Sequence, residues 1–256
     1  MTHPFSTRQI PFYLTAPGPC PYLPGRQERK LFTRIDPGEG PGLNDALTHA
    51  GFRRSQGVLY RPACEQCDAC HSARIPVETF DWTRSFRRVL KRNDDLVRDE
   101  KPAETTAEQF ALLTRYLDSR HGDGDMAGMS YGEYVLMVSD GAQRTDLVEY
   151  RDAAGRLRAC ALVDRLRDGP SLLYSFFDPD DAPRSPGTFM VLDAIRWTKE
   201  NGFSNVYLGY WVPGSRKMDY KSRFRPLEVL TSVGWQSLED ILNDIGDEPD
   251  ADEGED

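Results

Sequence analysis

The sequence reads LVEYRDAAGRLRACALVDRLRDGPSLLYSFF over residues 147–177, and this stretch decides the fold. It holds three apolar, strand-forming runs: Leu147–Tyr150, Leu157–Leu166 and Leu172–Phe177. Short turns separate the runs, because Asp152–Gly155 and Asp168-Gly169 supply residues that readily adopt tight turns. The stretch therefore predicts three consecutive antiparallel strands.

Helical patterns flank these strands. Thr105–Gln109 contains two overlapping capping boxes, which predict the start of a helix, and Tyr131–Val138 reads as a second helix. Downstream, Ser185-Pro186 supplies an N-cap and a first helical residue for a longer helix. The apolar run Val206–Trp211 then predicts a further strand.

Two helices, a meander, a long helix and another strand is the order of a GNAT-like (N-acetyltransferase-like) acyltransferase core. We therefore expect an α/β (α+β) fold with a smaller N-terminal cysteine-containing domain. The expected division is an N-terminal domain of residues 1–98, a GNAT-like catalytic domain of residues 99–238 and an acidic, disordered tail of residues 239–256.

The chain has 256 residues and a formal net charge of −9, but the charge is uneven. From Pro226 onward there are eleven acidic residues and no Lys or Arg, which leaves 32 basic and 30 acidic residues before it. The folded part is therefore close to neutral, which permits a polyanionic partner without requiring one. No run approaches the roughly 18 consecutive apolar residues of a membrane span, and the first residues lack the pattern of a secretory signal.

Three of the five cysteines lie in one loop, Cys64-x2-Cys67-x2-Cys70. The apolar runs Val58–Tyr60 and Ile75–Val77 flank the loop, and we expect them to be the strand ends that hold it. Such a loop either grips a metal or holds cations over a site, and a tight turn with buried thiols is the alternative. Five cysteines in a chain of this length make no disulfide framework, so we expect a reducing cytoplasm.

The spacing of these cysteines is close to that of an iron–sulfur run, but Arg74 stands at the fourth position. Zinc or an Fe–S cluster at Cys64, Cys67 and Cys70 would therefore need a distant ligand. Cys20 is the first candidate, with His71 as a substitute.

Cations alternate with aromatic residues after the strand at Val206–Trp211. Tyr210 and Trp211 are followed by Lys217 and Lys221, and this interleaving suits phosphates plus a stacked base. An aromatic-capped strand end is the alternative. A helix predicted from Asp81 carries a second group of cations, which fits either phosphate contact or plain solubility: Arg84, Arg87, Arg88, Lys91 and Arg92.

A third constellation places the carboxylate of Asp178 at the end of the Leu172–Phe177 strand, just before the helix that begins at Ser185-Pro186. A helix N-terminus is a ready anion site. The Q/R-x-x-G-x-G/A loop that cradles coenzyme A in acetyltransferases is absent, which argues against an acetyl-CoA enzyme. HExxH, Walker and Rossmann fingerprints are also absent.

Taken together, these stretches resemble the arginyl-tRNA–protein transferase family, in its short prokaryotic branch of aspartate/glutamate leucyltransferases. The resemblance spans residues 10–236. It is carried by the segments Cys20–Arg26, Gly51–Gly57, Tyr60–Val77, Ser85–Arg88, Tyr174–Pro179, Tyr207–Trp211 and Lys217–Lys221.

The resemblance implies that an aminoacyl-tRNA donates its amino acid to the α-amine of proteins beginning with Asp or Glu, which marks them for N-degron degradation. The prokaryotic branch implies leucyl-tRNA as the donor, and arginine is the alternative. No cofactor is required by this chemistry. Eukaryotic relatives bind an iron–sulfur cluster through N-terminal cysteines, but the cysteine arrangement of this chain differs.

The reaction needs a cation for the acidic acceptor, and Arg74 and Arg26, with Tyr22, are the expected acceptor-binding residues. The expected tRNA-binding residues are Lys217, Lys221, Tyr210, Trp211, Arg87, Arg88 and Lys91. Asp178 and Tyr220 are the candidates for proton transfer. Two other hypotheses stay open: a non-catalytic, metal-bound module that binds tRNA or a partner, and a coenzyme A acyltransferase.

Overall fold

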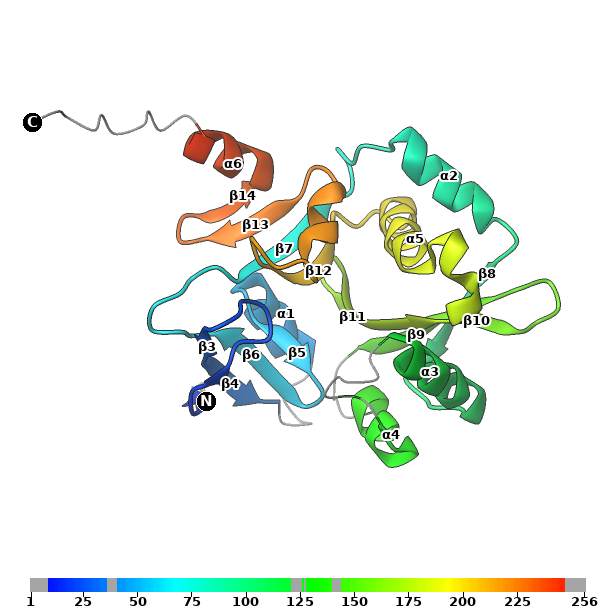
Figure 1. Cartoon of the computed structure of the whole chain (residues 1–256), viewed down its shortest axis with the longest axis horizontal. Helices are drawn as coiled ribbons and strands as arrows, with labels where there is room; N and C mark the ends of the chain where they lie inside the picture. The colour runs from blue at the N-terminus through cyan, green and yellow to red at the C-terminus, as the bar shows by residue number, and fades with distance from the viewer. Residues whose placement is uncertain (1–8, 36–40, 121–125, 127, 140–143, 247–256) are drawn as a thin grey trace, which may run out of the picture.

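The computed structural model describes residues 9–35, 41–120, 126, 128–139 and 144–246 (Figure 1). Most strands among these residues belong to one sheet of eight, in the order β14-β13-β7-β12-β11-β10-β9-β8. Their bounds are β7 (His71–Pro76), β8 (Val97–Pro102), β9 (Thr145–Arg151), β10 (Leu157–Leu166), β11 (Gly169–Phe177), β12 (Asn205–Trp211), β13 (Glu228–Thr231) and β14 (Gly234–Ser237).

The predicted meander is confirmed, since β9, β10 and β11 pair antiparallel in sequence order. β12 then pairs parallel to β11, with Ser171 opposite Tyr207. The helices are α1 (Pro41–His49), α2 (Arg84–Arg92), α3 (Ala107–Arg120), α4 (Tyr131–Ser139), α5 (Pro186–Glu200) and α6 (Leu238–Gly246). Two 3₁₀ helices are η1 (Pro179–Arg184) and η2 (Asp219–Arg223). The predicted GNAT-like α/β class is confirmed by this mixed sheet and its order of elements.

Local signals place the helix starts. Thr106 and Gln109 form the capping box of α3. The Thr106 N–H donates to Oε1 of Gln109 at 2.8 Å, and the Gln109 N–H donates to Oγ1 of Thr106 at 3.2 Å. Ser185 occupies the N-cap of α5 and Pro186 its first turn, although the Ser185 side chain makes no cap hydrogen bond. Within the described part of the chain, no helix combines the length and hydropathy needed to span a bilayer.

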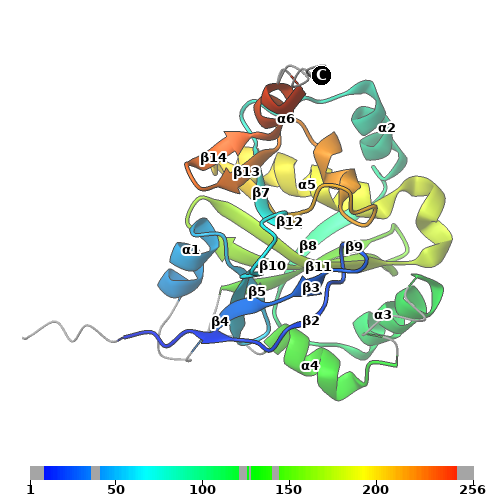
Figure 2. The same ribbon diagram turned by 60° about the vertical axis from the view of Figure 1, so that its left-hand side comes forward.

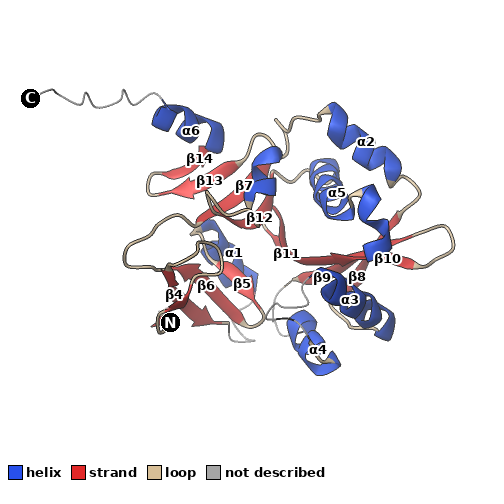
Figure 3. Ribbon diagram, viewed as in Figure 1, coloured by secondary structure: helices blue, strands red, loops and turns tan. Residues whose placement is uncertain are grey.

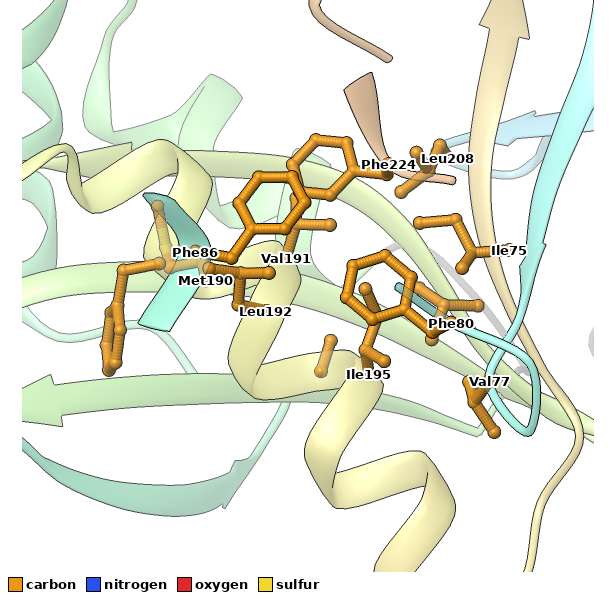
Figure 4. Close-up of a cluster of buried hydrophobic side chains, with 14 of the residues drawn as sticks. Ile75, Val77, Phe80, Phe86, Met190, Val191, Leu192, Ile195, Leu208 and Phe224 are labelled. Atoms are coloured by element: carbon orange, nitrogen blue, oxygen red, sulfur yellow. The ribbon is translucent and has the colours of Figure 1, made fainter. Parts of the chain in front are cut away.

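Helices cover both faces of the large sheet, with α2 and α5 on one side and α3 and α4 on the other (Figures 2 and 3). β10 shows why both faces are apolar. Its Ala159, Ala161 and Val163 belong to the core under α5, whereas Cys160 and Leu162 belong to the core under α3 and α4. The larger core also contains a parallel stack of Phe86 and Phe224 rings, whose centroids are 5.2 Å apart (Figure 4).

A second sheet of four strands, in the order β1-β4-β6-β5, lies beside the large one. Its bounds, with those of the separate β2–β3 pair, are β1 (Tyr13–Leu14), β2 (Gly18–Pro19), β3 (Gln27–Glu28), β4 (Lys30–Arg34), β5 (Arg53–Ser55) and β6 (Val58–Pro62). A small core of Ile35, Phe52 and Leu59 stabilises this sheet together with residues of α1.

The cysteine loop connects the two sheets. Both flanking strands exist as predicted, but β6 pairs with β4 and β5, whereas β7 lies between β12 and β13 of the large sheet. The large sheet therefore runs across the predicted domain boundary near residue 99. Helix α6 forms within the first part of the predicted tail, and residues 247–256 of that tail lie outside the described residues.

A buried ion pair fastens the small sheet to the large one. Arg54 of β5 contacts both carboxylate oxygens of Asp164 of β10, at 2.6 and 2.7 Å, and both side chains are 1 % exposed. Asn44 of α1 donates to the same carboxylate at 2.8 Å. His49 of α1 makes a second contact with the large sheet, because its Nε2 lies 3.3 Å from the carboxylate of Asp168 in the turn before β11.

Candidate functional site

The candidate active site lies where β11 and β12 run side by side beneath the small sheet. Arg53, the first residue of β5, reaches both strands with its guanidinium group. One nitrogen donates to the Leu173 carbonyl of β11 at 2.6 Å, and the other donates to the Leu208 carbonyl of β12 at 3.3 Å. The N-terminal part of the chain thus inserts a cation between two strands of the large sheet.

Gly209 makes room for this cation. The register of β12 against β7 shifts between Tyr207 and Gly209, and Gly209 has φ +71°, as expected of a bulge. A Cβ atom at Gly209 would lie 1.3 Å from Nη1 of Arg53. Only glycine therefore permits the observed position of the Arg53 guanidinium.

Lys221 of η2 places a second cation in this site. Its side chain is buried, with 3 % of the residue exposed, and its ammonium group donates a hydrogen bond to the Tyr210 carbonyl. Burial and, second, the charge of Arg53 lower the pKa of Lys221 to about 7. The influence of Arg53 on this pKa shows that the two cations share one environment.

Tyrosines line the same site. Burial, and then the neighbouring Tyr60, raise the pKa of Tyr22 to about 12, with Arg53 acting in the opposite direction. The Tyr210 hydroxyl lies 2.9 Å from the Tyr60 carbonyl oxygen and 3.0 Å from that of Gly51. Tyr22 is thus placed near Arg53, while Tyr210 serves as a buried link between the two sheets.

Arg74, the expected acceptor cation, lies in β7 and already has partners. Its Nε donates to Glu228 at 2.7 Å, and its guanidinium lies 4.3 Å from the centre of the Trp235 ring. Burial acts to lower its pKa, but hydrogen bonds with Tyr207 and Glu228 raise it. Arg26 is exposed and lines a surface hollow beside the cysteine loop.

The four candidate metal ligands, Cys20, Cys64, Cys67 and Cys70, gather in one region, all free and half-buried. Burial, followed by the charges of the other three sulfurs, raises the pKa of Cys70 to about 12. Among the described residues, no three of these sulfurs lie within 4.8 Å of one another. The donor set therefore has the right chemistry for zinc or an Fe–S cluster, at a wider spacing than a closed tetrahedral site has.

The expected tRNA-binding residues divide into exposed and buried groups. Arg87, Arg88 and Lys91 are exposed on α2, and Lys217 is exposed before η2. Tyr210, Trp211 and Lys221 are buried. The exposed cations offer a surface to phosphates, whereas the buried residues face the interior around β12.

Asp178 lies at the end of β11 in a set of ionic contacts. It is 4 % exposed, its carboxylate contacts Arg115 at 2.8 Å and Arg158 at 3.1 Å, and it caps η1 by accepting from the Asp180 N–H. Tyr220 is half exposed, and burial raises its pKa. The contacts of Asp178 are those of a residue that fixes the β11–α5 connection.

We expect Asp178→Asn to lower the free energy of unfolding by roughly 2 kcal/mol, because the change weakens two charged hydrogen bonds at a buried position. Urea unfolding followed by circular dichroism measures this change. Activity should change by no more than about twofold, because the carboxylate of Asp178 already contacts Arg115 and Arg158. A large loss of kcat with unchanged stability would instead identify Asp178 as the proton-transfer group.

Two residues of the site, Arg53 and Gly209, were not predicted from the sequence. Signals for them were present. Gly209 interrupts the apolar run Val206–Trp211, and a glycine inside a strand often marks a bulge or a close approach of another group. The adjacent Arg53 and Arg54 point to opposite sides of β5, so at least one of them had to enter the protein interior.

Comparisons with known proteins give consistent results. The family model described as arginine-tRNA-protein transferase, N terminus, matches residues 18–88, and the one described as arginine-tRNA-protein transferase, C terminus, matches residues 108–231. The aspartate/glutamate leucyltransferase of Maricaulis maris is 64% identical, over 98% of this chain and 99% of that protein. The protein of the same name from Caulobacter vibrioides is 56% identical, over 93% and 87%.

Solved structures resemble the chain more distantly. FemX has a TM-score of 0.44 at 10% identity, covering 73% of this chain and 64% of its own. A tandem GNAT protein from the clavulanic acid biosynthesis pathway has a TM-score of 0.39 at 14% identity, covering 83% of this chain and 59% of its own.

Proposed function

Since this chain belongs to the aspartate/glutamate leucyltransferases, we propose that it transfers leucine from leucyl-tRNA to proteins whose first residue is Asp or Glu. The observation that carries the proposal is the 64% identity to a relative of that name over nearly the full length of both chains. The transfer would mark the acceptor protein for N-degron degradation in the cytoplasm.

The reaction demands little activation from the enzyme. The acceptor α-amine attacks the ester carbonyl of leucyl-tRNA, an N–C bond forms, the ester C–O bond breaks, and the terminal ribose hydroxyl leaves with a proton. The ester is already activated, and an amine of pKa about 8 loses its proton readily near neutrality. Most of the acceleration can therefore come from holding the amine and the ester carbonyl together.

The exposed cations are proposed to hold the tRNA. Arg87, Arg88 and Lys91 lie on one exposed helix, α2, and Lys217 is exposed on the segment after β12. Exposed lysines and arginines can neutralise backbone phosphates and release counterions, as tRNA binding requires. For the buried Tyr210, Trp211 and Lys221, contact with tRNA stays a prediction from the sequence.

Tyr220 is proposed as a proton donor. Its hydroxyl is protonated at neutral pH and carries a proton for the leaving ribose oxygen, although burial raises its pKa and so makes it a weaker acid than a free tyrosine. Arg74, with Arg26 and Tyr22, is proposed to contact the acceptor, and Tyr22 is supported by its position near Arg53.

Zinc or an Fe–S cluster held by Cys20, Cys64, Cys67 and Cys70 would cross-link the loop between the two sheets to the N-terminal segment. A closed site of four thiolates supplies folding energy and fixes the backbone. The proposed transfer chemistry uses only side chains of the protein.

A transfer assay tests the proposed function. Purified protein is incubated with leucyl-tRNA or arginyl-tRNA and with peptides that begin with Asp, Glu or Ala. We expect leucine to be attached to the acidic peptides only. Attachment of arginine would reassign the donor. Equal labelling of all peptides, or tRNA binding without turnover, would refute the proposal.

A further inference from the structure

Lys221 is buried and Arg53 is half-buried, and these two basic side chains share one site without an acidic partner among the described residues. The contacts of Arg53 are the neutral carbonyls of Leu173 and Leu208, and Lys221 donates to the neutral carbonyl of Tyr210. Within the described residues, neither side chain forms an ion pair with a carboxylate. The charge of Arg53 contributes to the lowered pKa of Lys221.

Other inward-facing arginines of the protein are compensated. Arg54 pairs with Asp164, Arg74 with Glu228, and Arg158 with Asp178 and Asp181. Buried charges are normally paired in this way, because an unpaired charge in the interior loses its hydration and gains no compensating interaction. The pair Arg53 and Lys221 departs from the pattern of its own fold, which marks it as a binding site for an anion.

Three anions take part in the proposed reaction: the phosphates of tRNA, the oxyanion that forms on the ester carbonyl, and the side-chain carboxylate of the acceptor. Phosphates suit the exposed cations of α2 better than a site in which Lys221 is 3 % exposed. The oxyanion is a single atom that exists only briefly. A planar guanidinium beside an ammonium group matches a carboxylate, which offers two oxygens and a permanent charge.

We propose that Arg53 and Lys221 bind the side-chain carboxylate of the acceptor's N-terminal Asp or Glu and so select acidic acceptors. This inference rests on the proposed function, of which it names the specificity-determining residues. Arg53 is held over Gly209 by two strand carbonyls, which fixes its position before the acceptor arrives. Tyr22 lies near both Arg53 and Tyr60, as their influence on the pKa of Tyr22 indicates.

The lowered pKa of Lys221 gives binding a recognisable proton signature. At pH 8 the free Lys221 amine is largely neutral, because its pKa is about 7. A carboxylate beside it favours the charged form, so binding of an acidic acceptor should take up a proton. Among the described residues, the groups that interact with Lys221 are Arg53 of β5, the Tyr210 carbonyl of β12 and the Tyr220 ring of η2, and none of these is a carboxylate.

The test is calorimetric binding of a peptide beginning with Asp and of its isosteric partner beginning with Asn, without tRNA, in buffers of different ionisation enthalpy. Both peptides carry the same α-amine, so the difference between them isolates the carboxylate. We expect the wild-type protein to bind the Asp peptide at least about tenfold more tightly and with proton uptake. Lys221→Met should lose both the preference and the uptake.

Lys221→Arg tests whether the positive charge at position 221 or its change of protonation is responsible for the effect. It should retain part of the preference for Asp but show no proton uptake, because arginine stays charged at all relevant pH values. Arg53→Lys should weaken the preference, since lysine cannot reach both strand carbonyls. Lys199→Met, at an exposed lysine of α5, is the matched control and should bind like the wild type.

The outcomes separate this inference from the proposed function. If Lys221→Met and Arg53→Lys are folded and keep the full preference for Asp, the inference is overturned while leucine transfer stands, and Arg74 becomes the carboxylate partner. If the variants lose kcat without any change in peptide binding, the pair acts on the reacting ester and the inference is also overturned. Selective binding of Asp peptides without leucine transfer would support the inference and refute the proposed function.

Discussion

Gly209→Ala is expected to lower kcat/KM for acceptors beginning with Asp by about 100-fold, a loss typical of a misplaced binding group. The added Cβ would lie 1.3 Å from Nη1 of Arg53. The far end of an arginine side chain can move, so the protein should fold. The guanidinium would nevertheless leave the carbonyls of Leu173 and Leu208, and the acceptor would meet a displaced cation. Initial rates of leucine transfer at varied peptide concentration measure the effect.

Gly155→Ala provides the matched control. Gly155 also has positive φ, +77°, but a Cβ atom there would have no neighbour within 4 Å. Backbone strain should cost both variants about 1 kcal/mol of stability, and Gly209→Ala should lose further stability with the hydrogen bonds of Arg53. Only Gly209→Ala should lose transfer. Equal activity of the two variants would show that the position of Arg53 does not matter for the reaction.

Arg54→Met is expected to lower the free energy of unfolding by about 3–5 kcal/mol, which is a large part of the stability of an ordinary domain. The change leaves the carboxylate of Asp164 buried without its arginine, because both side chains are 1 % exposed. Urea unfolding at neutral pH, followed by circular dichroism, measures the loss.

The double variant Arg54→Met with Asp164→Leu should recover much of this loss, because it also removes the uncompensated carboxylate of Asp164. Arg156→Met is the exposed control. Arg156 pairs with Asp152 but is 71% exposed at its side chain, so its removal should cost less than about 1 kcal/mol. A loss at Arg54 no larger than at Arg156 would contradict the structural role of the buried pair.

The elements that the sequence predicted well are those with strong local signals. The three strands of the meander alternate or run apolar between clear turns, and α3 begins at a capping box that its own residues form. Such signals depend on neighbours within a few residues. The family resemblance then added the order of motifs along the chain.

What escaped prediction depends on contacts between distant residues. β6 and β7 flank the cysteine loop as expected, but they belong to different sheets. The local sequence of a strand does not indicate which strand it pairs with. β8 is mostly polar and β13 is only four residues long, so their patterns are weak. The proximity of Lys221 to Arg53 likewise joins residues that lie far apart in sequence.

The position of β7 also constrains how the protein is made. This strand is synthesised early, yet one neighbour in the sheet, β12, ends at Trp211, and the other, β13, begins at Glu228. The centre of the large sheet therefore cannot close until the residues of β13 have left the ribosome. Until then both edges of β7 stay unpaired, with Ala73 and Ile75 exposed beside them. We infer that the nascent chain relies on late, long-range pairing, the slowest kind of strand assembly.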